Sequence, residues 1–347
     1  MLTRRQFFIP AAALGSAALA IPRLSRAQAS STATPAPGDL RYYGAVADSD
    51  VTGALADAIA SGYPVYIPAA LGLCSVSASM PITRPVTIYG DGRGMSALKL
   101  AGDFSLLAVA NNIQNCVFRD FAIVGQGGAV TQPAISYTNA PYNTISGMRI
   151  EYCGIGVGYY PGTIKPYSSF LNSILDSELL YNVQAGVLGE SQTNCLRMLG
   201  VTLGGGGGLF GIKLLDSNNL CWLGGCCEGV TQSAAYLANQ VASGAGCHRL
   251  SDINLGNSSA LGDIVIGATG CPPVIATQID TVSFAPNVGA DSGLNVVNAY
   301  NVMLTGCAVL SGYYGSGLIQ GWLRVGAASQ GVSTNIASRS GAYSYTS

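Results

Sequence analysis

The chain has few of the residues on which metal sites and nucleic-acid sites are usually built. Its 347 residues include one histidine, His248, and no two cysteines spaced as Cys-x-x-Cys. Zinc sites usually combine several imidazole and thiolate ligands, so a zinc site is not expected. Charged residues make up 10% of the chain and the formal net charge is −1. Binding to phosphates needs a basic face, so nucleic acid is not expected as a partner.

Long apolar runs are also missing outside the amino terminus. There, Arg4 and Arg5 precede an apolar stretch that ends at Ile21, and the small residues Ala27 and Ala29 follow. A basic start, a short apolar segment and small residues are typical of a cleavable export signal. Paired arginines before two phenylalanines resemble a twin-arginine signal.

We expect residues 1–29 to be a twin-arginine signal peptide that engages the twin-arginine export machinery. The apolar stretch of about fifteen residues is too short to span a bilayer stably. The mature protein should therefore be periplasmic or secreted, without membrane contact after signal removal; an uncleaved amino-terminal anchor is the alternative. Removing this segment takes away four of the 16 basic residues and none of the 17 acidic ones, which leaves a net charge of −5.

What the chain does contain is a repeat of eight residues that recurs eight times between Cys116 and Val309. Successive copies start 27, 29, 22, 26, 28, 29 and 25 residues apart. The third place of each copy is apolar: Phe118, Ile145, Ile174, Leu196, Trp222, Leu250, Ile279 and Leu304. The eighth place is apolar or cysteine: Ile123, Ile150, Leu179, Val201, Cys227, Leu255, Phe284 and Val309.

A short strand that recurs every 20 to 50 residues or so is typical of a solenoid. The copies lack helical periodicity and are bounded by Gly and Asn, so the coils should consist of β-strands. The 46 glycines fit a fold with tight corners. Asparagines cluster where the copies begin, and we expect them to form corners and hydrogen-bonded ladders. The sequence therefore predicts an all-β, single-stranded parallel β-helix.

The segments before the repeat have the properties of a linker and an end cap. Residues 30–38 are rich in Ser, Thr, Ala and Pro and are expected to be a linker, with the β-helix domain covering 39–347. Asp50 or Thr52 can cap a helix that runs to about Ser61 and ends at Gly62. Solenoids need their open ends covered, so this short helix is expected to close the amino-terminal end.

Ten cysteines in an exported protein raise the question of disulfides. Cys195 and Cys221 occupy the second place of adjacent copies, and neighbouring coils lie about 4.8 Å apart, a distance that a disulfide accepts. A bridge between the two coils is one hypothesis. The other is that cysteine is a small apolar filler of the stack.

Three amino-terminal segments resemble a known family. Leu40–Asp48, a following short helix, Val65–Pro68 and Val86–Gly94 resemble the start of pectate-lyase-like β-helix proteins, in particular the rhamnogalacturonase and epimerase-like branch. The resemblance covers about residues 39–100, and the coils extend it to about 310. It implies a right-handed parallel β-helix and action on a polysaccharide. It also implies a strand at Leu40–Ala45 and a site on the outer face of one sheet, built from stacked coils.

Two aspartates are the first candidates for such a site. Asp120 and Asp176 share the fifth place two coils apart, with Gly147 between them. Two coils correspond to about 10 Å, near the separation of the two carboxyl groups in inverting glycosidases. Alternatively, both are corner acids that cap backbone amides.

Arginines supply further candidates. Arg149 and Glu178 share the seventh place on adjacent coils, where they could bind a sugar acid or form a surface ion pair. Arg197 is at an outer place one coil further and could stabilise the enolate-like intermediate of a β-elimination, or act as its base. The loop from Tyr159 to Tyr167 offers Tyr160, Lys165 and Tyr167 for sugar stacking and carboxylate binding.

The function expected from these features is a polysaccharide lyase that cleaves an acidic polysaccharide by β-elimination. Asp120, Asp176, Glu178 and Arg197 are the candidate catalytic residues. Such a lyase commonly uses Ca²⁺, held by carboxylates, to neutralise the substrate. Two alternatives stay open: a glycoside hydrolase of the same fold with paired carboxylates, and a non-catalytic carbohydrate-binding surface protein.

The export signal gives the first testable prediction. Replacing Arg4 and Arg5 by lysine should leave the protein in the cytoplasm, because the paired arginines are what marks this signal as the twin-arginine type. Fractionation followed by immunoblotting of cytoplasm and periplasm measures the outcome. Undiminished export of the Lys-Lys variant would contradict the assignment.

Overall fold

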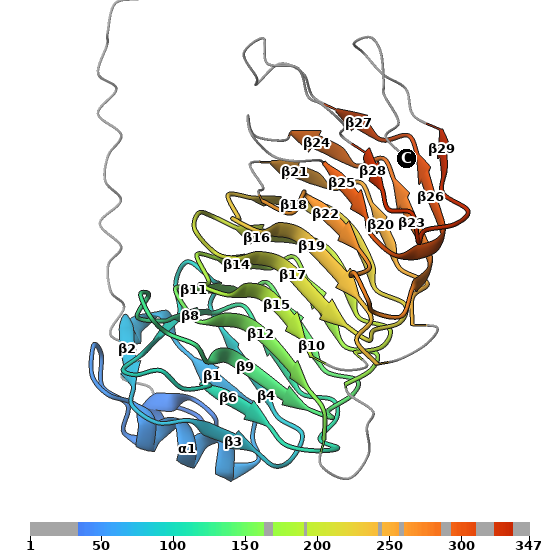
Figure 1. Ribbon diagram of the computed structural model, residues 1–347. Coiled ribbons are helices and arrows are strands. Elements are labelled where there is room, and N and C mark those ends of the chain that lie inside the picture. The colour runs from blue at the N-terminus through green and yellow to red at the C-terminus, as the bar shows by residue number, and fades with distance from the viewer. Residues whose placement is uncertain are drawn as a thin grey trace, which may run out of the picture. The chain divides into compact units, whose positions relative to one another are not determined.

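The chain from residue 35 onwards folds as a stack of β-coils, which we describe from a computed structural model (Figure 1). The structure describes residues 34–162, 169–190, 193–241, 245–256, 260–285, 293–309 and 323–335. All strand pairings in these residues are parallel, and the strands form about nine turns of a solenoid. The predicted all-β right-handed parallel β-helix with a short amino-terminal helix is confirmed. The predicted signal peptide lies outside the described residues.

Each coil contributes strands to three rows. The first row, in stacking order, is β1 (Val65–Ile67), β4 (Thr87–Gly90), β7 (Val117–Arg119), β10 (Thr144–Ser146), β13 (Ser173–Leu175), β16 (Arg197–Gly204), β18 (Cys221–Glu228), β20 (Arg249–Ser251), β23 (Val274–Asp280), β26 (Ala299–Thr305) and β29 (Ser333–Asn335).

The second row follows the first after a corner. It consists of β2 (Leu73–Val76), β5 (Ala97–Leu100), β8 (Ala122–Val124), β11 (Arg149–Glu151), β14 (Glu178–Leu180), the second halves of β16 and β18, β21 (Asn254–Gly256), β24 (Ser283–Ala285) and β27 (Ala308–Val309).

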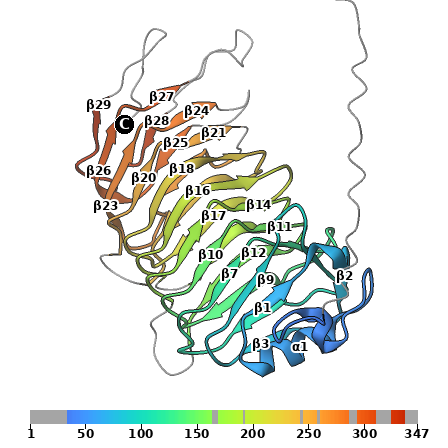
Figure 2. The same cartoon turned by 180° about the vertical axis from the view of Figure 1, so that it is seen from behind.

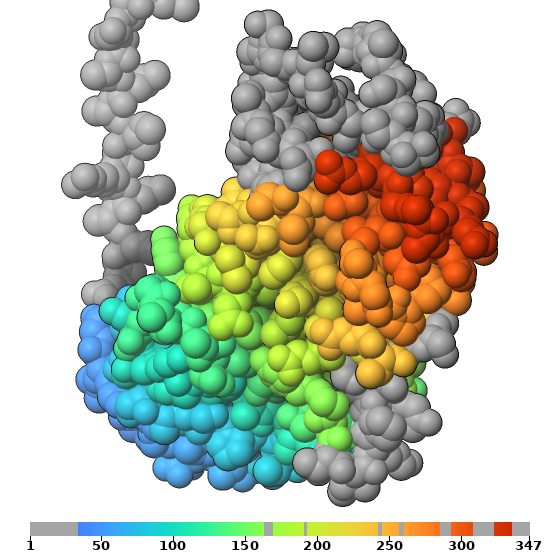
Figure 3. Space-filling view, in the orientation of Figure 1, coloured from blue at the N-terminus to red at the C-terminus, as the bar shows by residue number. Residues whose placement is uncertain are grey.

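The third row is a separate ten-stranded sheet. It consists of β3 (Met80–Ile82), β6 (Leu107–Val109), β9 (Pro133–Thr138), β12 (Ile155–Tyr160), β15 (Ala185–Gly189), β17 (Phe210–Leu215), β19 (Ser233–Ala238), β22 (Ile264–Ile266), β25 (Leu294–Val296) and β28 (Leu323–Val325). Figures 2 and 3 show successive coils lying directly against one another, because colours that follow in the sequence are neighbours in space.

The core lies inside the coils and is built from in-register apolar ladders. One ladder in the first row contains Ile88, Phe118, Ile145, Ile174, Met198, Trp222, Leu250, Ile279 and Leu304. These side chains are at most 1% exposed. Burying a side chain of this size stabilises the fold by roughly 1.5 to 3 kcal/mol, and each sits on its equivalents in the coils before and after.

The ladder corrects one copy of the predicted repeat. Met198, not Leu196, pairs with Ile174 and Trp222, and Leu203, not Val201, continues the second-row ladder. Leu196 and Val201 are also fully buried, but Leu196 lies just before β16 and Val201 follows the corner residue Gly200 within it. Both alternatives keep the same five-residue spacing, so apolar pattern alone does not separate them. The corrected spacing is 24 residues on either side of Met198.

The corrected register also removes the predicted bridge between Cys195 and Cys221. Arg197, not Cys195, lies beside Cys221. Cys195 occupies a turn, where its N–H donates to the carbonyl of Asn218. Both thiols are free, so the disulfide hypothesis is wrong for this pair.

The corner between the first and second rows has a left-handed backbone in every coil from β7 to β26. The residues there, with φ between 45° and 67°, are Asp120, Gly147, Asp176, Gly200, Gly224, Asp252, Thr281 and Gly306. We call this set the corner column. Asp and Gly are residues that adopt this conformation at low cost, which explains why they fill every place of the column except that of Thr281.

A second ladder holds the turn before the first row. The Oδ1 atom of Asn172 accepts the N–H of Asn143, and Oδ1 of Asn143 accepts the N–H of Cys116. The predicted asparagine ladder is confirmed for these residues. Further along, His248 takes the same place: its Nδ1 accepts the N–H of Leu220 at 3.3 Å, and the ring is 3% exposed.

The amino-terminal end is covered as predicted by one helix, α1 (Thr52–Ser61), which packs Leu55, Ala58 and Ile59 inward and ends at Gly62 with φ 87°. The carboxylate of Asp50 accepts the N–H of Thr52.

The expected strand at Leu40–Ala45 is wrong. Leu40–Tyr43 forms a 3-10 turn, since the carboxylate of Asp39 accepts the N–H of Arg41 and Gly44 ends the turn in a left-handed conformation.

The place of His248 predicts a pH-dependent stability. Burial lowers the pKa of His248 from 6.5 to about 4, so the unfolded chain binds a proton at a pH where the folded chain does not. The stability that this difference provides is complete above pH 6.5 and is lost as the pH falls toward 4. At pH 4.5 the loss should be roughly 2 to 3 kcal/mol.

The matched variant is His248→Asn, which keeps an acceptor of the kind that Asn143 and Asn172 provide in the same ladder. Urea unfolding at pH 7.5 and 4.5 should show a smaller difference in unfolding free energy for the variant than for the parent. An equal difference in both proteins would show that His248 is not responsible.

Candidate functional site

The corner column places two carboxylates and a bare residue on three consecutive coils. Asp120 and Asp176 are separated by Gly147, so they lie two coils apart, which is about 10 Å. Each carboxylate leans toward the following coil. A Cβ atom on Gly147 would lie 2.6 Å from Oδ1 of Asp120, and one on Gly200 would lie 2.7 Å from Oδ1 of Asp176. Both carboxylates therefore point toward the carboxyl-terminal coils, that of Asp120 over Gly147 and that of Asp176 over Gly200.

The two aspartates have different surroundings. The carboxylate of Asp120 forms an ion pair with Arg119, with Nη1 and Oδ2 2.8 Å apart. The carboxylate of Asp176 is exposed and has no hydrogen-bond or ion-pair partner in the part of the chain that the structure describes. The sequence prediction that they share a place two coils apart is confirmed; their catalytic role is a proposal.

Arg119 is itself held by a row of aromatic rings. Its guanidinium lies 5.1 Å from the ring centre of Tyr89, and the rings of Tyr89 and Tyr66 stack with centres 5.2 Å apart. The hydroxyl of Tyr66 donates to Asp91, and burial together with this carboxylate raises the pKa of Tyr66 to about 12. This row of rings holds Arg119 beside Asp120, on the side of Asp120 that faces the amino-terminal coils.

Beside Asp176, the carboxylate of Glu178 pairs with two arginines. Oε2 of Glu178 accepts from Nε of Arg149 at 2.6 Å, and Oε1 pairs with Nη2 of Arg93 at 2.9 Å. The hydrogen bond to Glu178 raises the pKa of Arg149. Both carboxylate oxygens of Glu178 are thus occupied by guanidinium groups, which leaves neither free to act on a substrate. The predicted alignment of Arg149 and Glu178 on adjacent coils is confirmed.

Arg93 is the member of this cluster that sequence reasoning missed. It lies in the turn after β4 and reaches three coils onward, about 14 Å, where Nη1 donates to the backbone carbonyl of Asp176. No periodic signal connects residue 93 with residue 178. The sole hint was an arginine in a glycine-rich turn beside the first coil.

The remaining sequence candidates lie apart from this cluster. Arg197 projects outward from β16 between Ser173 and Cys221, and has no ion-pair partner among the described residues. Tyr160 ends β12 in the third row, where its ring lies over Gly158 and burial, with Glu190 nearby, raises its pKa to about 12. The structure does not bring either residue to Asp176.

Two other predicted binding residues, Lys165 and Tyr167, lie outside the described residues.

The described residues offer no ligand set for a metal ion. No three carboxylate, thiol or imidazole groups of the described ranges come together in an arrangement that could hold one. Asp120 and Asp176 are on separate coils, and Glu178 is occupied by two guanidinium groups. The carboxylate set expected for Ca²⁺ is therefore not found here, and no step below depends on it.

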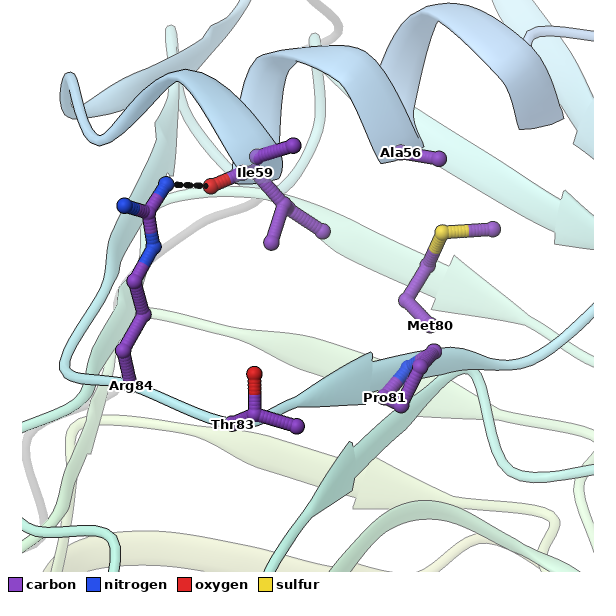
Figure 4. Close-up of a pocket in the computed structure, with 7 residues that line it drawn as sticks. Ala56, Ile59, Met80, Pro81, Thr83 and Arg84 are labelled. Atoms are coloured by element: carbon purple, nitrogen blue, oxygen red, sulfur yellow. Dashed lines mark hydrogen bonds between the residues drawn. The ribbon is translucent and has the colours of Figure 1, made fainter.

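A groove of about 230 Å³ lies at the amino-terminal end, between α1 and β3. Figure 4 shows Ala56 and Ile59 of the helix facing Met80, Pro81 and the segment that follows. The guanidinium of Arg84 donates to the carbonyl of Ile59 and so caps the end of the helix. The lining is apolar and contains no acid, so this groove lacks the groups that bond cleavage needs. None of the helices in the described ranges is long and apolar enough to cross a membrane.

Comparisons with known proteins give the fold. No family model and no curated relative matches the sequence. Among solved structures, the Agl-KA catalytic domain has a TM-score of 0.66 at 15% identity, covering 88% of this chain and 59% of that chain. DFA-IIIase from Arthrobacter chlorophenolicus A6 has a TM-score of 0.63 at 11% identity, covering 89% and 86%.

A third structure is the catalytic domain of a GH87 α-1,3-glucanase in complex with tetrasaccharides, with a TM-score of 0.53 at 15% identity, covering 88% of this chain and 59% of that one. The chain thus spans about 59% of the length of two of these structures. At this identity, the likeness shows that the β-helix fold is shared.

The pairing around Glu178 predicts a modest and salt-dependent contribution to stability. Glu178→Gln should lower the free energy of unfolding by about 1 kcal/mol at low salt, because partly exposed ion pairs contribute about that much. The loss should shrink in 1 M NaCl, where exposed charges are screened.

Urea unfolding at both salt concentrations measures the effect. The matched control is Glu151→Gln on β11, a half-buried residue near Arg149 whose carboxylate forms no hydrogen bond or ion pair among the described residues. Equal losses in the two variants would show that the arginines do not stabilise the fold through Glu178.

Proposed function

We propose that this protein is a carbohydrate-active enzyme that hydrolyses the glycosidic bonds of a polysaccharide at Asp120 and Asp176. The observation that carries the proposal is the pair of corner carboxylates, two coils apart, on either side of the bare Gly147. Their separation of about 10 Å is close to the 6.5–9.5 Å that leaves room for sugar and water in inverting enzymes. Gly147 has no side chain, and this gives the carboxylate of Asp120 room to lean over the coil between the acids, toward Asp176.

The surroundings of the two acids favour different roles. We assign the role of general base to Asp120, which forms an ion pair with Arg119. We assign the role of general acid to Asp176, whose carboxylate has no cationic partner among the described residues. In this mechanism Asp176 gives a proton to the leaving oxygen, and Asp120 removes one from the water that attacks the opposite face of the sugar. The products are one new reducing end and one new hydroxyl.

The solved structures support an action on carbohydrate. One similar structure is named as an α-1,3-glucanase and was determined with tetrasaccharides bound. A glucanase cleaves by hydrolysis, so this name favours hydrolysis over elimination. The low identity leaves the polymer itself to experiment.

A lyase acting on an acidic polysaccharide is the second candidate. It is favoured by the arginines beside Asp176, since Nε of Arg149 is fixed by Glu178 while its two Nη atoms have no partner among the described residues. A guanidinium held in this way can donate two parallel hydrogen bonds to a sugar carboxylate. Arg197, the proposed base of a lyase, lies apart from Arg149 and Glu178, so the geometry favours the hydrolase.

The carboxylate pair predicts the effect of removing either acid. Asp120→Asn and Asp176→Asn should each reduce the release of reducing ends from the cleaved polymer by at least about 100-fold, since a positioned acid or base contributes 10²–10⁴-fold. Asparagine also accepts the left-handed corner, so both variants should fold. The polymer is first found by screening neutral glucans and acidic polysaccharides with the parent protein.

The matched control is Asp252→Asn, at the same corner five coils beyond Asp120 and one beyond Gly224. It should keep full activity. Hydrolysis gives no absorbance at 235 nm, whereas β-elimination gives a rising signal from the unsaturated product. A rise at 235 nm would replace the hydrolase by the lyase, and full activity of both corner variants would remove the site.

A further inference from the structure

Next to Asp176, the outer face of the first row carries three leucines on consecutive coils. Leu175, Leu199 and Leu223 are paired in register, one per coil, in β13, β16 and β18. Their side chains are on the solvent side: Leu199 is 39% exposed, and the other two are half-buried. We call this set the leucine stripe.

The stripe is confined to these coils. The same outward position is held by Arg119 and Ser146 in the coils before it, and by Ser251 and Asp280 in the coils after it. A protein that needed leucine for folding alone would bury it, because an exposed apolar side chain contributes little to stability. Clustered apolar side chains on a polar surface mark a place where something binds.

The corners beside the stripe differ in how open they are. Each leucine directly precedes a corner residue: Asp176, Gly200 and Gly224 respectively. An added Cβ on Gly200 would lie 2.7 Å from Oδ1 of Asp176, so the carboxylate of Asp176 covers that corner. At Gly224 an added Cβ would find one atom within 4 Å, the backbone N of Gly200 at 3.9 Å, although Asp120, Asp176 and Asp252 show that this conformation does not require glycine. The stripe therefore runs from the carboxylate of Asp176 to an open corner at Gly224.

The chemistry of the stripe fits a linear sugar chain. A pyranose ring presents an apolar C–H face that can lie on leucine, and its hydroxyls need polar groups at the edges. Arg197 and Thr202 project on the outer surface on either side of the stripe. The leucines repeat once per coil, every 4.8 Å or so, which is comparable to the length of one hexose unit. A single-file row of contacts with this repeat matches a chain of sugars better than the broad face of a protein.

We propose that Leu175, Leu199 and Leu223 form three consecutive sugar subsites, along which a linear polysaccharide runs parallel to the coil stack and away from Asp176. This inference rests on the proposed function, because it uses Asp176 as the point of cleavage. It adds the direction of the bound chain and a preference for substrates long enough to cover the stripe.

The test compares Leu199→Ser and Leu223→Ser with the parent enzyme on oligosaccharides of increasing length from the polymer that the enzyme cleaves. Each variant should raise KM for chains that cover the stripe by roughly three- to tenfold, the effect of losing part of one leucine contact. The kcat should not change. For oligosaccharides too short to reach the altered coil, KM should equal that of the parent. Leu199→Ile should restore binding, because it keeps an apolar side chain suited to a strand.

The control is Leu73→Ser on β2, a leucine that is 46% exposed and lies away from the corner carboxylates. It should leave KM and kcat unchanged at every length. Sedimentation velocity of the same variants separates a sugar site from an interface between copies of the chain. A change in association state with unchanged KM would overturn the proposal, as would an unchanged KM for long chains.

A direct binding measurement keeps this inference separable from the proposed reaction. Calorimetric titration of long oligosaccharides into Asp176→Asn, with and without Leu199→Ser, reports binding without turnover. Weaker binding of the double variant supports the subsites even if Asp176 proves not to be catalytic. Equal binding of both overturns the subsites and leaves the catalytic role of Asp176 to its own test.

Discussion

The parallel register between coils is the constraint on which the rest of the structure depends. Each strand is hydrogen-bonded to its equivalents in the coils before and after, so every residue has a fixed neighbour about 4.8 Å away. Side chains of one kind therefore collect in columns, whether inside as Phe118, Ile145 and Ile174 or outside as the leucine stripe. A shift of one residue would turn a buried ladder to the solvent, so the core enforces the register, and the register in turn aligns the surface.

The same constraint decides where chemistry can be placed. The corner column is forced into a left-handed conformation, which restricts it mainly to Gly, Asp and Asn. Aspartate there serves the backbone and at the same time puts a carboxylate on the surface, whereas glycine leaves a gap. The column contains Asp120, Gly147 and Asp176 in succession, followed by two glycines. The left-handed backbone explains why each of these places holds Asp or Gly, but it does not explain this order.

The fold could be predicted from the sequence because the strand pattern is repeated, whereas the site could be predicted only in part. The pattern occurs eight times, so the fold was predicted correctly although one copy was placed two residues off, where Leu196 and Met198 are both apolar. Asp120, Asp176, Arg149 and Glu178 could be aligned since register alone decides their neighbours. Arg93 could not, because its reach across three coils depends on the path of an irregular turn. The 3-10 turn at Leu40–Tyr43 escaped for a similar reason: a local hydrogen bond from Arg41 to Asp39 outweighed the apolar pattern.

The arginines and leucines around Asp176 bear on the choice between the two candidate reactions, hydrolysis and β-elimination. Glu178 neutralises much of the charge of Arg93 and Arg149 before any substrate arrives, so a polyanion would gain only the part of the field that remains. The leucine stripe gains nothing from charge and favours the apolar face of any pyranose. We expect such a surface, with partly neutralised arginines beside apolar subsites, to select substrates by ring shape and linkage more than by net charge. In the proposed hydrolase, the corner carboxylates are the groups that determine which bond is cleaved, and the column that aligns them also aligns the proposed sugar chain.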